Sequence, residues 1–359
     1  MATLKDVAAE AGVSISLVSH YLNDRPGVGA KSRERIEAAI EKLSYRPNGI
    51  ARSLVRQKTD TIGVVVSNLC NPFIFDLLNG MDEAAEEKKY NVIYCSAGGS
   101  LEKKQRYMHL FADGRVDAML IYGAFMEDDQ LIRRLTKTHF PFALVENDLP
   151  DAGADQILID NFDAGYRATK HLIELGHRRV AYMAGHPHLK VALERFRGYR
   201  KALEESGIPY TDQLSIQLDI FSESSQTEIE NCSANFPSVS RQEYFEAAYR
   251  SMGHYLQENP LPDALFCSGD ILAFGAIKAL SERGIHVPEH VSIIGFDDEK
   301  SLEFGLDIPQ ITTMRQPLHQ AGYLGVTNLI RRIEHPDTPV TQTVLRAELV
   351  ERGSCRPKT

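Results

Sequence analysis

The first part of the chain carries small hydrogen-bonding side chains at helical spacing and no catalytic set. Residues 14–24 read SISLVSHYLND, so Ser16, Ser19 and His20 share the outward face of an expected helix with Ile15. Hydroxyl and imidazole groups placed in this way can exchange hydrogen bonds with base edges and phosphates. The sequence has no nucleophile elbow, phosphate-binding loop or H-E-x-x-H motif. We therefore expect a binding protein with no enzymatic activity, no cofactor and no metal.

The residues around this face predict three short helices. Thr3 and Asp6 form a capping box that starts the first helix, and Gly12 stands where a left-handed residue would end it. Ser14 is a good N-cap for the second helix, and a third helix is expected over about residues 31–43. Two helices joined by so tight a turn are typical of a helix-turn-helix, whose second helix enters the major groove of DNA. A helical hairpin used only for packing is the alternative. The expected buried residues are Leu4, Val7, Ala8 and Ala11, then Leu17 or Val18 with Tyr21 and Leu22, then Ile36, Ala39, Ile40 and Leu43.

Charge and composition favour the DNA-binding interpretation. The net charge is -9 over 359 residues, yet residues 1–60 hold ten Lys or Arg against seven Asp or Glu. A basic module on an acidic body can bind phosphate locally while the body is repelled from it. No apolar run is long enough to cross a membrane and no apolar signal region opens the chain, so we expect a cytoplasmic protein. The five cysteines are scattered without a C-x-x-C pair, which argues against a zinc site or a disulfide framework.

From Thr61 onward, β-branched runs alternate with helical patterns. TIGVVVS at residues 61–67 is a continuous apolar run, as a strand buried on both faces requires. The alternation occurs in two series, and the second begins near residue 164. This pattern predicts an α/β fold class, with two lobes that each contain a parallel sheet between helices. A ligand is expected between the lobes, outside the carboxyl ends of the strands.

Long stretches of the sequence resemble one known family. LKDVAAEAGVSISLVSHYLND and KSRERIEAAIEKLSYRPNGIARSL, followed in order by IGVVVSNLCNPF, GHRRVAYMAG, VPEHVSIIGFDD, TTMRQPLHQAG and ELVERGS, resemble the lac repressor (LacI/GalR) family of bacterial transcription regulators. The resemblance covers nearly the whole chain and implies a periplasmic-binding-protein-like core whose chain crosses between two lobes three times. It implies a DNA-binding domain over residues 1–45, a hinge over 46–60 and a core over 61–359. The expected lobes are 61–160 with 317–343, and 161–316 with 344–359.

The resemblance also implies how DNA is bound. Ile15, Ser16 and His20 match positions through which the second helix contacts bases. The family often has Arg at the position of His20, so we expect a different operator sequence here. Because each chain has one reading helix, we expect a homodimer on a near-palindromic operator. Other residues match family positions that hold phosphate: Thr3, Leu4 (through its backbone), Ser14, Ser19, Asn23, Lys31 and Ser32.

For the core, the resemblance implies an effector site at the strand ends. A guanidinium and carboxylates are suited to sugar hydroxyls, so we expect a small carbohydrate that relieves repression. A purine or a protein co-regulator is the alternative effector, and a solute-binding module of the same fold is the alternative function. Asp270 and Asp160 could instead be helix N-caps, and the polar segment 221–242 reads as a surface excursion without an assigned role. The residues that match family effector positions are Phe73, Ile74, Glu146, Arg195, Asp270 and Asp297.

Residues 46–60, RPNGIARSLVRQKTD, are the expected hinge. Pro47 suits the first turn of a helix. By the resemblance, such hinge helices form on DNA, and Leu54 matches the position that inserts into the minor groove. An apolar wedge of this kind unstacks a base step and kinks the duplex. A basic linker that frays without DNA is the alternative.

Changing Leu54 to Ala tests the hinge. We expect Leu54→Ala to weaken operator binding strongly and to reduce the DNA bend, because Ala is too short to wedge between bases. Circular-permutation gel shifts measure the bend. Arg52→Ala should instead lower the slope of log affinity against log salt by about one unit if Arg52 holds a phosphate. Equal bending by the wild type and Leu54→Ala would exclude the wedge.

Overall fold

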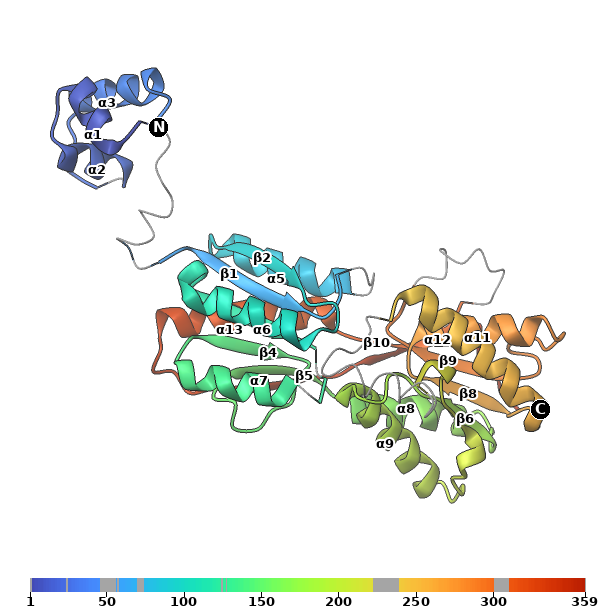
Figure 1. Cartoon of the computed structure of the whole chain (residues 1–359). Coiled ribbons are helices and arrows are strands. Elements are labelled where there is room, and N and C mark those ends of the chain that lie inside the picture. Colours follow the sequence, from blue (N-terminus) through green and yellow to red (C-terminus); the bar gives the residue numbers. More distant parts are fainter. Residues whose placement is uncertain are drawn as a thin grey trace. The chain divides into compact units, whose positions relative to one another are not determined.

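The computed structural model describes residues 2–23, 25–45, 56, 58–69, 74–123, 125–126, 128–221, 239–299 and 310–358. Within these ranges the chain forms two compact units, residues 1–59 and 60–359, which are described separately (Figure 1). Most of the expected hinge, including Leu54, lies outside the described residues, as do Phe73 and most of the polar segment 221–242.

The first unit is a three-helix domain with the expected local signals. Thr3 and Asp6 form the capping box of α1 (Leu4–Ala11), and Gly12 ends this helix in the left-handed conformation at φ 61°. The Ser14 hydroxyl accepts a hydrogen bond from the Leu17 amide and caps α2 (Ile15–Leu22). No side chain caps α3 (Ala30–Lys42), because Gly29 stands at its N-cap. The predicted helix-turn-helix is confirmed, and its core includes Val7, Ala8, Ala11, Val18, Ile36 and Ala39.

The second unit contains two six-stranded sheets, one in each lobe. The strand order is β11-β5-β4-β3-β1-β2 in the first lobe and β12-β10-β9-β8-β6-β7 in the second. Every neighbouring pair is parallel except β10 and β12, which pair antiparallel. Parallel sheets need cover on both faces, which explains the continuous apolar strands. The predicted α/β fold class is therefore confirmed, apart from the short antiparallel β12.

The elements of the two lobes follow the alternation in the sequence. The first lobe consists of β1 (Thr61–Val66), α5 (Phe75–Glu87), β2 (Asn91–Ser96), α6 (Leu101–Leu110), β3 (Ala118–Tyr122), α7 (Asp128–Leu135), β4 (Phe142–Val145), β5 (Asp155–Ile159), α13 (Leu318–Glu334) and β11 (Gln342–Leu345). The second consists of α8 (Asn161–Glu174), β6 (Val180–Met183), α9 (Lys190–Glu205), β7 (Ser215–Ile216), α11 (Arg241–Glu258), β8 (Ala264–Cys267), α12 (Asp270–Ser281), β9 (Ser292–Phe296), β10 (Thr312–Arg315) and β12 (Glu348–Val350).

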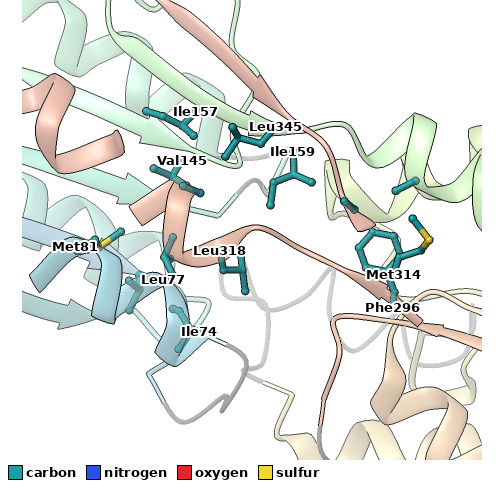
Figure 2. Close-up of a cluster of buried hydrophobic side chains, with 14 of the residues drawn as sticks. Ile74, Leu77, Met81, Val145, Ile157, Ile159, Phe296, Met314, Leu318 and Leu345 are labelled. Atoms are coloured by element: carbon teal, nitrogen blue, oxygen red, sulfur yellow. The ribbon is translucent and has the colours of Figure 1, made fainter. Parts of the chain in front are cut away.

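Three short segments join the lobes: 159–161, 315–318 and 345–348. The last lies beyond the expected boundary at 343/344, because β11 continues to Leu345 in the first lobe. Buried apolar side chains of both lobes form one cluster along these connections, which includes Ile159 and Leu345 as well as Met314 and Phe296 of the second lobe (Figure 2). The connections are therefore packed parts of the core, and they bring the carboxyl ends of both sheets toward one another.

Two glycines let α8 and α9 cross in close contact. A Cβ at Gly165 would lie 2.3 Å from the Arg195 carbonyl oxygen, and a Cβ at Gly198 would lie 2.1 Å from the Phe162 carbonyl oxygen. Real side chains do not fit at such distances. The two glycines therefore set the depth at which α9 lies against α8, and with it the position of Arg195.

Gly165→Ala is expected to destabilise the core. The added methyl group pushes α9 away from α8, and overpacking of this kind costs about 1–3 kcal/mol. Urea unfolding followed by circular dichroism measures the loss. Gly253→Ala in α11 is the matched control, because its new Cβ would meet only the end of the flexible Arg283 side chain, at 3.3 Å. If Gly165→Ala is as stable as Gly253→Ala, the helix crossing does not depend on the glycine.

Candidate functional site

A cavity of about 240 Å³ lies between the two lobes of the second unit. Residues just beyond the strands line it from both sides: Glu146 after β4 in the first lobe, and Ser268 and Asp297 after β8 and β9 in the second. This is the expected place for a ligand in an open parallel sheet. Arg195 from α9 also faces the cavity.

Arg195 is buried, and its guanidinium organises the polar wall. Its Nε donates to Asn161 Oδ1 at 2.8 Å, and its Nη1 donates to the Ser268 carbonyl oxygen at 2.7 Å. The guanidinium carbon lies 3.5 Å from the centre of the Phe296 ring. Among the described residues Nη2 has no hydrogen-bond partner, so the guanidinium keeps a donor for a ligand.

Asp297 supplies the complementary acceptor. The structure holds it in the left-handed region at φ 105°, and its Oδ1 accepts a hydrogen bond from Gln316 Nε2 at 2.5 Å. Oδ1 also lies 3.8 Å from Arg195 Nη1. Burial raises the pKa of Asp297 to about 7, and the nearby Arg195 limits the rise. Within the described part of the chain Oδ2 has no hydrogen-bond partner, so Asp297 keeps an acceptor for a ligand next to the guanidinium of Arg195.

Glu146, on the first-lobe side of the cavity, mainly holds neighbouring residues in place through hydrogen bonds. Its Oε1 accepts from the Ile159 amide at 2.6 Å, and its Oε2 accepts from Asn161 Nδ2 at 3.1 Å. Burial raises the pKa of this carboxyl, and the two hydrogen bonds oppose the rise. Since Asn161 also binds Arg195, a chain of hydrogen bonds runs from Glu146 across the first connection to the guanidinium.

Asp270 is the predicted effector residue that the structure does not bring to the cavity wall. Its carboxylate accepts from Thr313 Oγ1 at 2.9 Å and from the Glu299 amide at 2.7 Å. It lies within the first turn of α12 but does not cap it, because Gly269 is the N-cap residue. By contrast, Asp160 does cap α8, so the alternative reading holds for Asp160. Asp270 therefore links β10 to the residues that follow β9, and it does not line the cavity.

Other residues that line the cavity were not singled out from the sequence. Ile74 lines it as predicted, while Tyr122, Phe125, His186 and Gln316 were missed. Tyr122 ends β3, and Gln316 and His186 closely follow β10 and β6, so the strand-end rule could have found three of them. Phe125 lies three residues beyond the end of β3, as far as His186 lies beyond β6, so the same rule could have found it too. Burial lowers the pKa of His186 to about 4, so its imidazole is neutral and presents a flat, weakly polar face. Tyr244 of α11 lines the same cavity.

The first unit presents the predicted DNA-binding residues on α2 and at helix ends. Ile15 is 44% exposed and Ser16 is exposed, while Ser19 and His20 are half-buried. Ser14 caps α2 through an acceptor lone pair, so its hydroxyl proton stays available for a phosphate. Asn23 Nδ2 donates to the Ser19 carbonyl oxygen at 2.8 Å. Leu4 and Ser32 are half-buried, and Thr3 and Lys31 are exposed.

No group of three or more His, Cys, Asp and Glu is placed to hold a metal ion in the described parts of the chain. None of the helices described is long and apolar enough to cross a membrane.

Comparisons with known proteins cover nearly the whole chain. Residues 3–48 match "Bacterial regulatory proteins, lacI family", residues 59–227 match "Periplasmic binding proteins and sugar binding domain of LacI family", and residues 169–355 match "Periplasmic binding protein-like domain". The HTH-type transcriptional repressor PurR of Aliivibrio fischeri is 32% identical over 99% of this chain and 98% of its own.

Solved structures agree with these matches. The transcriptional regulator CelR in complex with cellobiose is 28% identical, with a TM-score of 0.69 over 99% of this chain and 100% of its own. The lac repressor dimer bound to operator and the anti-inducer ONPF has a TM-score of 0.82 over 99% of both chains. At 24% identity, the latter likeness shows the fold.

The raised pKa of Asp297 predicts a pH-dependent stability. The folded chain holds a proton on this carboxyl up to about pH 7, whereas the unfolded chain releases it near the ordinary value of 3.8. The folded state thus binds more protons in this window, and stability falls as pH rises through it. Relative to Asp297→Asn, the free energy of unfolding should fall between about pH 4 and pH 7, by at most about 1.4 kcal/mol per pH unit.

Urea unfolding of both proteins at several pH values measures this difference. Asp337→Asn, at an exposed carboxylate, is the control. A wild type and an Asp297→Asn variant with parallel pH profiles would contradict the assignment.

Proposed function

The chain belongs to the LacI family of bacterial regulatory proteins and is a DNA-binding transcriptional repressor, and we propose that a small carbohydrate bound between its lobes controls operator binding. One observation carries the proposal of a carbohydrate. Arg195 and Asp297 line one cavity, and neither Arg195 Nη2 nor Asp297 Oδ2 has a hydrogen-bond partner among the described residues. A sugar hydroxyl both donates and accepts, so neighbouring hydroxyls satisfy both groups at once.

The rest of the cavity suits the other side of a sugar ring. Phe125, His186, Leu189 and Tyr244 present apolar or flat faces to the cavity. A sugar ring has C–H groups on its faces and hydroxyls at its edge, so it can pack on such side chains while its edge reaches Arg195. The cellobiose complex of CelR is a related precedent for a carbohydrate ligand.

A purine is the second candidate effector. Relatives at about a third identity carry the name PurR, and a flat heterocycle could stack on the aromatic side chains of the cavity. A purine edge also offers donors and acceptors to Arg195 and Asp297. A thermal-shift screen of sugars and purines separates the two candidates, because a ligand at 100 times its dissociation constant stabilises the protein by about 2.7 kcal/mol.

On DNA, we propose a homodimer in which each chain reads one half-site. One helix-turn-helix contacts only half of a near-palindromic operator. Ile15, Ser16 and His20 are the proposed base-reading residues, and the caps of α1 and α2 are the proposed phosphate contacts. A bacterial transcriptional repressor acts on DNA in the cytoplasm, where we place this protein.

Arg195→Ala is expected to yield a repressor that no longer responds to effector. It removes charge-assisted hydrogen bonds to the ligand, each of which contributes about 1.5–3 kcal/mol, so effector affinity should fall at least about tenfold. Operator affinity without effector should stay close to that of the wild type. Calorimetry with the sugar or purine found in the screen, followed by operator titrations with and without it, measures both effects.

Two further variants make the result decisive. Arg197→Ala on the same helix removes an exposed guanidinium that pairs with Glu194, and it should respond normally. Arg195→Lys keeps the buried charge and covers the case in which Arg195→Ala fails to fold. Unchanged effector affinity in a folded Arg195 variant means that the ligand does not bind at this site.

A further inference from the structure

Lys190, the first residue of α9, joins the second lobe to the first. Its ammonium donates to Asp129 Oδ1 at 2.6 Å, to Asn147 Oδ1 at 3.2 Å and to the Asp148 carbonyl oxygen at 3.0 Å. All three acceptors belong to the first lobe. The three donors of the ammonium are therefore all used across the gap between the lobes.

Residues next to Lys190 also form contacts that join the two lobes. The Met126 amide donates to the His188 carbonyl oxygen at 3.1 Å, and Phe125 forms an antiparallel bridge with Leu189. The Phe125 ring also meets the His186 ring edge-on, with centroids 5.3 Å apart. We call this set of contacts the clasp: it joins residues 125, 126, 128, 129, 147 and 148 of the first lobe to residues 186–190 of the second.

A buried ion pair holds the first-lobe half of the clasp. Lys104 of α6 donates to Asp128 Oδ2 at 2.5 Å, and the two side chains are 4% and 1% exposed. The same carboxylate oxygen accepts from the Phe125 amide at 3.3 Å. Phe125 and Met126 are therefore braced against α6 rather than left as a free loop.

The clasp differs from the other links between the lobes because no chain connection runs through it. The three connections lie at 159–161, 315–318 and 345–348, far along the chain from residues 125–129 and 186–190. Lobes that open about those connections keep their hinge contacts but must break the clasp. Phe125, His186 and Leu189 also line the cavity, so breaking it exposes the ligand site.

We propose that the clasp holds the two lobes closed when no effector is bound, and that Lys190 sets how often the lobes open. This deepens the proposed function, since it assigns the residue that controls access to the effector cavity. Lys190 and Asp129 are 22% and 32% exposed at their side chains. The pair is therefore weak enough to break in a regulatory motion and is open to screening by salt.

Amide hydrogen exchange tests this role of the clasp in the full chain without effector or DNA. The Met126 amide reports opening directly, because its acceptor lies in the other lobe. Exchange mass spectrometry of a peptide that contains Met126 should show about twofold to fivefold faster exchange in Lys190→Met than in the wild type. Raising the salt from about 0.05 M to about 0.5 M should speed this exchange in the wild type and much less in Lys190→Met.

Lys201→Met is the matched control. It removes the same charge from the same helix, but Lys201 pairs with Glu204 and Glu205 within the second lobe. It should leave Met126 exchange unchanged. Asp129→Asn removes the partner of Lys190 in the first lobe, so it should speed exchange as Lys190→Met does. It replaces Lys190→Met in the test if that variant does not fold.

Two results would overturn the proposal that the clasp holds the lobes closed. One is equal Met126 exchange in the wild type, Lys190→Met and Asp129→Asn. The other is faster exchange throughout β6 and α9 in Lys190→Met, which would make Lys190 a stabiliser of the second lobe alone. Either result leaves repression and effector binding intact, since these are measured separately by operator titration and calorimetry.

Discussion

Burial of one guanidinium is the constraint on which the proposed effector site depends. A guanidinium is a charged group with several donors, so the donors of Arg195 need partners once the side chain leaves water. The fold supplies them from three separate places: Asn161 after the first connection, the Ser268 carbonyl after β8 and the face of Phe296 at the end of β9. These elements are far apart in the chain, so the position of Arg195 reports the packing of the whole second lobe.

The same constraint links the lobes. Asn161 shares its amide between Arg195 and Glu146, and Gln316, at the second connection, donates to Asp297. Two of the three connections therefore carry polar side chains that hydrogen-bond to residues of the cavity wall. A ligand that draws Arg195 and Asp297 toward itself acts on those connections and so favours one arrangement of the lobes. A ligand shifts an equilibrium only by its difference in affinity for the two states.

Local signals in the sequence predicted the first unit well, because caps and turns depend on neighbouring residues. Thr3, Gly12 and Ser14 act as expected. The strand-end rule located the cavity but not the direction of each side chain. Asp270 follows a strand closely, yet its carboxylate turns toward Thr313, which lies 43 positions away in the sequence. The bond from Lys190 to Asp129 spans 61 positions and joins surface charges, and sequence patterns carry no information about such a pair.

We propose that the effector and the operator act on one equilibrium between lobe arrangements. Calorimetric titration of the effector against free protein and against the operator-bound protein tests it most directly. Linkage requires that the ratio of the two effector affinities equal the ratio of operator affinities with and without effector, a factor of about 5–150 for typical couplings. We predict equal ratios well above one for a ligand that releases DNA. Identical effector affinities for free and operator-bound protein would contradict the account.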